Sequence, residues 1–188
     1  MQKLIVPQYT IPSSLFGTAL SDSNWDTAAH CGACVSVTGH LGNKITAMIV
    51  DQCPGCGTNH LDLYENGYTK LAGTDPKYNG IMPVSWDFVP CGISSPIVLK
   101  NKSGTSPYWF SMQVQNANVA VASLEVSIDG GKTWSKATRQ TYNYFENASG
   151  YGTETVDVKV TSTSGESIIV KNVSIAENTT KTAASNFS

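Results

Sequence analysis

The stretch Asp51-Gln-Cys-Pro-Gly-Cys-Gly-Thr-Asn-His60-Leu-Asp62-Leu63 holds two carboxylates eleven positions apart, with a Cys-Pro-Gly-Cys turn between them. The apolar run over residues 44–50 predicts a buried strand that ends at Asp51. Pro54-Gly55 predicts a tight turn, because proline presets φ and glycine accepts a positive φ. Residues 60–63 then resume an extended pattern. Two acids on facing strand ends could handle a proton or hydrogen-bond a sugar. The alternative is a disulfide-stapled loop whose acids are merely solvated.

The composition excludes several classes of protein. Of 188 residues, 12 are Lys or Arg and 14 are Asp or Glu, which gives a net charge of −2. Basic residues do not cluster, so we expect no nucleic-acid partner. No apolar run reaches the roughly 18 residues of a membrane span, so we expect no membrane insertion. A polar surface with only 14% charged residues is typical of secreted β-rich proteins. Because residues 1–7 lack the apolar core of a signal peptide, we expect that a signal was removed or lies upstream.

Five cysteines lie in the first half of the chain: Cys31, Cys34, Cys53, Cys56 and Cys91. The spacing of the first four, Cys-x2-Cys twice with eighteen residues between, is also that of a zinc ribbon. Zinc sites of this kind usually carry basic residues around the thiolates, whereas here Asp51 stands beside Cys53. Disulfides are therefore the favoured interpretation, with no metal bound, and zinc is the alternative. Sequons consistent with an oxidising, glycosylating route begin at Asn101, Asn147, Asn172, Asn178 and Asn186.

A change in composition near residues 92–96 predicts a domain boundary. The last cysteine is followed by Ser94-Ser95-Pro96, and no thiol occurs after it. We predict a first domain over residues 1–93, a second over 94–176 and a disordered tail over 177–188. The tail is rich in Thr, Ser, Asn and Ala, which favours disorder.

Both domains are predicted to consist mostly of β-strands. In the first domain we expect strands at residues 34–38, 45–50, 60–63 and 81–86 and short helices at 15–20 and 63–71. Because no strand is followed by a long amphipathic helix, this layout favours a compact barrel. In the second domain apolar and polar residues alternate over several short segments, at residues 109–115, 123–129, 156–160 and 168–175. This pattern predicts an antiparallel β-sandwich of immunoglobulin-like type.

Trp109 is an aromatic residue on the polar face of its predicted strand. Phe110, Met112 and Val114 share the opposite parity. Trp109 should therefore stand in solvent, where an indole face can stack on the apolar face of a pyranose. Partial burial under a loop is the alternative. Its neighbour Tyr108 would point inward, unless the strand begins after it.

These motifs together resemble the expansins, and in particular the microbial, fungal-type expansin-like proteins. The resemblance runs from about residue 11 to residue 175. In the first domain it is carried by Cys31-Gly-Ala-Cys34, Val50-Asp51-Gln-Cys-Pro-Gly-Cys56, His60-Leu-Asp62-Leu63 and Val84-Ser-Trp86-Asp-Phe-Val-Pro-Cys91. In the second domain it is carried by Lys102, Pro107-Tyr-Trp-Phe-Ser-Met-Gln-Val-Gln-Asn116 and Tyr142-Asn-Tyr-Phe145.

The resemblance implies a double-psi β-barrel packed on a β-sandwich, without a cofactor. The protein would be a secreted monomer whose partners are cellulose and other cell-wall polysaccharides, and it would loosen plant walls without hydrolysis. Asp62 matches the indispensable acid of the family and Asp51 a supporting acid. Tyr108, Trp109 and Tyr142 match a carbohydrate-binding aromatic row, with Lys102 beside it. The resemblance also implies that Cys34 pairs with Cys91, and Cys53 with Cys56.

One departure from the family pattern bears on both fold and function. Family members begin with a Gly-x-Ala-Thr-Tyr strand that carries a cysteine and a polar groove residue, and this strand is expected to be absent here. The barrel would then be incomplete at its N-terminus, expose a sheet edge and be marginally stable. Family-45 endoglucanases, which share the barrel, place their catalytic base in this strand, so hydrolysis is the less favoured alternative. A third reading is a pure carbohydrate-binding protein in which only the second domain works.

Overall fold

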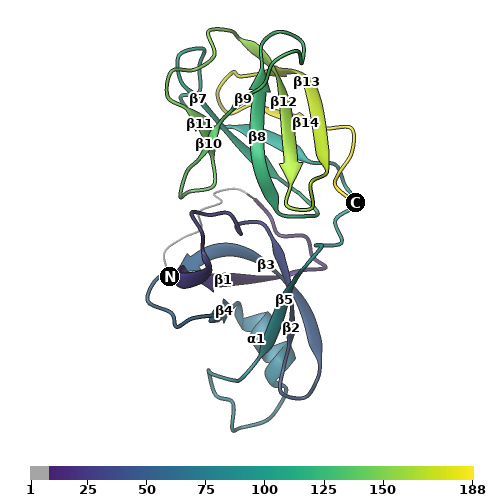
Figure 1. The fold of residues 1–188 in the computed structure, drawn as a ribbon. Helices are drawn as coiled ribbons and strands as arrows, with labels where there is room; N and C mark the ends of the chain where they lie inside the picture. Colours follow the sequence, from purple (N-terminus) through teal and green to yellow (C-terminus); the bar gives the residue numbers. More distant parts are fainter. Residues whose placement is uncertain (1–8) are drawn as a thin grey trace. The chain divides into compact units, whose positions relative to one another are not determined.

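The computed structural model describes residues 9–188, which form two compact units (Figure 1). The first unit contains the residues up to Asp26 together with His30–Cys91. The second contains Thr27–Ala29 together with Gly92–Ser188. Strands predominate in both units, as the sequence predicts. Every helix in the described part of the chain is too short or too polar to cross a membrane.

The described part of the first unit is built on a five-stranded sheet whose order is β4-β1-β3-β2-β5. Its elements are β1 (Phe16–Ser21), η1 (Asp22–Asn24), β2 (Cys34–Thr38), β3 (Lys44–Cys53), β4 (Leu61–Leu63), α1 (Glu65–Ala72) and β5 (Ser85–Val89). β1 runs parallel to β3, and the other neighbouring pairs are antiparallel. Apolar residues of these strands make the core together with Leu71 of α1; they include Leu20, Val35, Val37 and Ile49.

The first strand corrects one expectation. Residues 15–20, expected as a helix, lie largely in β1. β1 pairs with β3 on one side and β4 on the other, so it lies inside the sheet and leaves no open edge there. Gly17 disfavours helix, and pairing on both sides overrides the local helical pattern of this short segment. The helix expected at 63–71 is confirmed as α1.

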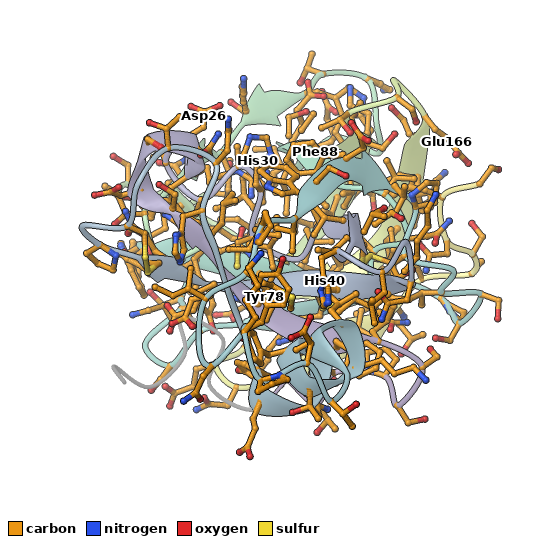
Figure 2. The ribbon with its side chains drawn as sticks, turned by 90° about the horizontal axis from the view of Figure 1, so that it is seen from below. Asp26, His30, His40, Tyr78, Phe88 and Glu166 are labelled. Atoms are coloured by element: carbon orange, nitrogen blue, oxygen red, sulfur yellow. A yellow bond between two sulfur atoms is a disulfide. The ribbon has the colours of Figure 1, made fainter. Side chains whose placement is uncertain are left out.

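Ring contacts fix two loops of the first unit (Figure 2). His30 stacks on Phe88 of β5, with 4.6 Å between ring centroids. His40 lies against Tyr78, with 4.1 Å between centroids. The hydroxyl of Tyr68 on α1 donates to the carbonyl of Tyr78 at 2.8 Å. The loop between α1 and β5 is therefore tied to the helix, and the strand expected at 81–86 begins only at residue 85.

The second unit has two sheets that share one core. The first sheet has the order β10-β11-β7-β6-β14 and the second β13-β12-β8-β9. The strands are β6 (Val98–Asn101), β7 (Phe110–Gln115), β8 (Val121–Ser127), β9 (Ser135–Lys136), β10 (Thr138–Arg139), β11 (Phe145–Asn147), β12 (Thr155–Ser162), β13 (Ser167–Ser174) and β14 (Thr180–Thr182). Phe110 and Met112 from one sheet and Leu124 and Val158 from the other are fully buried in a single cluster. This confirms that the apolar residues point inward, but Ser111 and Gln113, which the alternation places on the outer face of β7, are buried as well.

The prediction of a disordered tail over residues 177–188 is wrong. Residues Thr180–Thr182 form β14, which pairs antiparallel with β6. Phe187 is only 3% exposed and belongs to the core of the second unit. The side-chain amide of Asn186 donates to the carbonyls of Ser95 (2.7 Å) and Asn116 (2.8 Å). A polar composition favours disorder only where nothing anchors the chain, and here an edge strand and one aromatic side chain anchor it.

Candidate functional site

Asp51 and Asp62 lie on two strands that flank β1. Ala19 of β1 pairs with Asp51 of β3 on one side and with Asp62 of β4 on the other. Residues paired across neighbouring strands point to the same face of a sheet. With neighbouring strands about 4.8 Å apart, the two acid Cα atoms are about 10 Å apart. The sheet thus places the two acids in one row, which we call the acid row (Asp51, Ala19 and Asp62).

Local contacts hold the acid row in register. Asp62 is exposed and Asp51 is partly buried. The register of β1 against β3 shifts between Thr18 and Ala19, which sets the position of Asp51. The buried hydroxyl of Thr18 donates to the carbonyl of Asp62 at 3.2 Å. Asp51 Oδ1 accepts a hydrogen bond from the N–H of Gln52 at 2.8 Å.

The turn between the two acids is fixed from several sides. Cys53 and Cys56 form a disulfide within it. Ser21 Oγ, at the end of β1, donates to the Cys56 carbonyl at 3.1 Å. Gly55 N–H donates to Asp22 Oδ2 at 3.1 Å. Ser21 and Asp22 could not be identified from the sequence, because their role depends on β1, whose strand conformation the local pattern does not indicate.

The disulfides are those that the family resemblance implies. Cys34 of β2 pairs with Cys91, which follows β5, and Cys53 pairs with Cys56. The fifth cysteine, Cys31, is buried. Three of the four cysteines with zinc-ribbon spacing are therefore disulfide-bonded. Among residues 9–188 the structure contains no group of three or more His, Cys, Asp or Glu that could hold a metal ion.

In the second unit, Lys102 lies close to the rings of both Trp109 and Tyr142. The Lys102 Nζ atom is 5.2 Å from the ring centroid of Trp109 and 5.7 Å from that of Tyr142. β7 begins at Phe110, so Tyr108 and Trp109 precede the strand, and Tyr108 is 81% exposed. We call Lys102, Tyr108, Trp109 and Tyr142 the aromatic–lysine cluster.

Trp109 is less exposed to solvent than the sequence predicts. It is partly buried rather than fully in solvent, because it lies beside the loop that follows Lys102. A Cβ built on Gly104 of that loop would be 3.7 Å from Trp109 Cζ3. The alternative weighed for this residue, partial burial under a loop, is therefore what the structure shows.

Two glutamates that the sequence analysis missed support the aromatic–lysine cluster. Glu146 Oε1 accepts hydrogen bonds from the Tyr142 hydroxyl and from Ser111 Oγ, both at 2.8 Å. Partial burial, this hydrogen bond and the nearby negative charge together raise the pKa of Tyr142 to about 12. Glu177 Oε2 accepts from the N–H of Gly104 at 2.8 Å and so holds the loop that carries Lys102. Glu177 lies in the segment that was expected to be disordered, so sequence reasoning had no signal for it.

Comparison with known proteins finds expansins. No protein-family model matches the chain. Expansin-like protein 1 of Dictyostelium discoideum is 26% identical over 165 residues, which are 85% of this chain and 56% of that relative. Expansin-like protein 5 of the same organism is 27% identical, over 95% of this chain and 75% of the relative. Expansin-YoaJ of Bacillus subtilis is 29% identical, over 83% and 66%. The chain thus spans a little over half the length of the first of these relatives.

Among solved structures, an expansin has a fold similar to that of this chain. The apo expansin of Clavibacter michiganensis has a TM-score of 0.83 and 29% identity, covering 95% of this chain and 86% of that one. A mutant of that expansin, solved in complex with cellohexaose, matches equally well. The relatives named here come from a slime mould and from bacteria, so the expectation of a fungal-type protein has no support from them.

Proposed function

Because the chain belongs to the expansin family, we propose that it binds cellulose and loosens plant cell walls without hydrolysing their polysaccharides. We infer further that the first unit is a double-psi β-barrel and that the second is an immunoglobulin-like β-sandwich. The proposed domains are residues 1–93 and 94–176, the latter extended by the ordered residues 177–188. Two disulfides in the described residues fit an oxidising compartment, so we place the protein outside the cell, as a monomer.

The aromatic–lysine cluster is the observation that carries the binding part of the proposal. Tyr108, Trp109 and Tyr142 are all at least partly exposed, and aromatic faces of this kind stack on pyranose rings. Lys102, whose Nζ lies near the rings of Trp109 and Tyr142, supplies hydrogen-bond donors for sugar hydroxyls. The similarity to an expansin whose mutant was solved with cellohexaose supports cellulose as the ligand.

The acid row carries the wall-loosening part of the proposal. We assign the essential role to Asp62, which is exposed, and the supporting role to Asp51. Carboxylates are strong hydrogen-bond acceptors, so both can compete for the sugar hydroxyls that hold neighbouring glycan chains together. No bond of the polysaccharide is broken in this scheme, because the acids act only as hydrogen-bonding groups.

Binding isotherms on microcrystalline cellulose test the proposal directly. Trp109→Ala should abolish saturable binding, because it removes the largest aromatic ring of the aromatic–lysine cluster. Trp134→Ala is a matched control, since Trp134 also has a lysine over its ring, with Lys159 Nζ 4.8 Å from the centroid. The control should bind like the wild type. Wild-type protein that is folded but does not bind cellulose would refute the proposal.

Hydrolysis is the second candidate, for which Asp22, the acid that directly follows β1, would have to supply the base. The Asp22 carboxylate, however, accepts hydrogen bonds from the N–H groups of Ser23 (2.9 Å) and Gly55 (3.1 Å). It therefore holds the disulfide turn, which argues against a role as the base that activates water. Release of soluble reducing ends from cellulose distinguishes the two candidates. Steady release by the wild type that Asp62→Asn abolishes would replace the non-hydrolytic proposal.

A third experiment distinguishes our proposal from a protein that only binds carbohydrate. If only the second unit acts, Asp62→Asn should leave every activity of the protein unchanged, whereas Trp109→Ala should abolish cellulose binding. Our proposal instead expects Asp62→Asn to bind cellulose normally and to fail in extension assays on isolated cell walls.

A further inference from the structure

Tyr64 occupies the position at which α1 begins, and it is an unusual residue there. The N-cap of a helix favours Ser, Thr, Asp or Asn, whose side chains accept a hydrogen bond from the first turn. Among the described residues, the structure shows no side-chain hydrogen bond that caps this end of α1. Tyr64 therefore does not contribute the capping hydrogen bond that a Ser, Thr, Asp or Asn side chain would make at this position.

The ring of Tyr64 lies directly on β1. Its backbone N–H donates to the carbonyl of Gly17 at 3.0 Å, which continues the β4–β1 ladder by one residue. A Cβ built on Gly17 would be 2.7 Å from Tyr64 Cε2 and 2.8 Å from Cδ2. Any side chain at residue 17 would therefore displace the ring. Glycine at this position admits the tyrosine ring against the strand.

Tyr64 and the acid row share one face of the sheet. Side chains alternate along a strand, so Tyr64 points to the same side as Asp62, and Gly17 to the same side as Ala19. Burial and the negative charge of Asp51 raise the pKa of Tyr64, which agrees with a phenol close to Asp51. The side chain nevertheless keeps 40% of its surface exposed. An exposed aromatic ring thus stands beside two carboxylates.

We propose that Tyr64 is a carbohydrate-binding residue of the first unit, which stacks on a pyranose of a β-linked glycan while Asp51 and Asp62 hydrogen-bond its hydroxyls. This inference rests on the proposed function and adds an aromatic contact to the acid row. An aromatic face next to hydrogen-bonding carboxylates is the combination that a pyranose, with one apolar face and a rim of hydroxyls, would match. Tyr64 orients the sugar over the acid row, and the acids remain the groups that compete for hydroxyls.

Three substitutions test this role through the extension rate of isolated cell walls under constant load. Tyr64→Ala removes the ring and should lower the rate about fivefold, the size expected for one aromatic contact. Tyr64→Phe keeps the ring and should stay within twofold of the wild type. Gly17→Ala leaves Tyr64 in the chain but displaces its ring, so it should behave like Tyr64→Ala. All three should keep the wild-type cellulose isotherm, which depends on the second unit.

Tyr64→Ser separates the proposed role from a structural one. Serine can cap α1, so this variant should remain folded, as checked by its thermal unfolding, and should still lose the extension rate about fivefold. Wild-type extension rates in Tyr64→Ala and Tyr64→Ser would overturn the inference while leaving the proposed function intact. A wild-type protein that neither binds cellulose nor extends walls would refute the proposed function, and this inference with it.

Discussion

Asp51 and Asp62 are eleven residues apart in sequence, yet both pair with the same residue, Ala19, from opposite sides of β1. Ala19, which lies between them in the acid row, has only a methyl group as its side chain. The first strand therefore acts as a spacer that fixes the distance between the acids. This arrangement makes the effect of each acid separately testable.

Neutralising the two acids should have unequal effects on wall extension. Asp62→Asn should abolish extension, since the exposed Asp62 carboxylate is the more accessible of the two acids to a glycan. Asp51→Asn should reduce extension only in part. Asp87→Asn changes an exposed acid on β5 of the same sheet and should have no effect. Creep of heat-inactivated wall strips measures all three, and equal loss in Asp62→Asn and Asp87→Asn would contradict the assignment.

Tyr142 predicts a loss of stability at high pH. Its pKa is raised in the folded protein to about 12, whereas an unfolded tyrosine titrates near about 10. Below about pH 10 both states are protonated and the stabilisation is fully present. Between about pH 10 and 12 the unfolded state ionises first, so the free energy of unfolding falls. Urea unfolding across this range should show a smaller fall in Tyr142→Phe, and parallel curves for the two proteins would rule out the effect.

Glycosylation should be confined to a subset of the five sequons. Asn172 and Asn178 are exposed. By contrast, the Asn101 side chain is 3% exposed, and its Nδ2 donates to the carbonyls of Ser174 (2.7 Å) and Ala176 (3.0 Å). A glycan on that nitrogen would break these contacts and could not be accommodated in the core.

We therefore expect protein secreted from a glycosylating host to carry glycans at Asn172 and Asn178. Asn101 should be unoccupied, as should Asn186, whose amide nitrogen is also held by backbone carbonyls. Peptide mapping by mass spectrometry measures the occupancy of each site. Asn172→Gln and Asn178→Gln should each remove one glycan, and a folded protein with a glycan on Asn101 would contradict the expectation.

Phe187 should be essential for the stability of the second unit. It is 3% exposed, and truncating a buried phenylalanine to alanine typically removes about 3–5 kcal/mol. Phe187→Ala should lower the free energy of unfolding of this unit by that amount. Ile128→Ala is the control, because Ile128 is 63% exposed and its truncation should change stability by less than about 0.5 kcal/mol. Similar unfolding curves for the two variants would show that the tail is not anchored as described.

The strands that could be predicted from the sequence are those whose own residues show a clear apolar pattern. The inward parity of Phe110 and Met112, and the strand that ends near Asp51, could be read from single segments. The identity of β1 could not, because its short sequence is ambiguous and only its pairing with β3 and β4 decides its conformation. The tail failed for the same reason, since β14 depends on a partner strand about eighty residues earlier.

The residues of the candidate site also divide into those that the sequence predicts and those that only the fold reveals. The acids and aromatics could be found from motifs, because each stands in a recognisable stretch of sequence. Their supports, such as Glu146 and Glu177, could not, because a glutamate far along the chain looks like any solvated charge until folding brings it to Tyr142 or Gly104. Tyr64 could not be identified from the sequence, because its ring packs against Gly17, which lies on a strand that was not expected.

The place of β1 within its sheet also has a consequence for biosynthesis. β1 is the earliest strand of the described chain, yet both of its neighbours come later, and β4 ends only at Leu63. On the ribosome, residues Phe16–Ser21 must therefore wait for β3, which ends at Cys53, before one edge is paired, and for β4 before the other edge is paired. Pairing over such separations closes a long loop and is slow. A nascent chain of this protein thus presents an unpaired apolar strand during translation, which makes it a candidate for chaperone capture before the first unit can close.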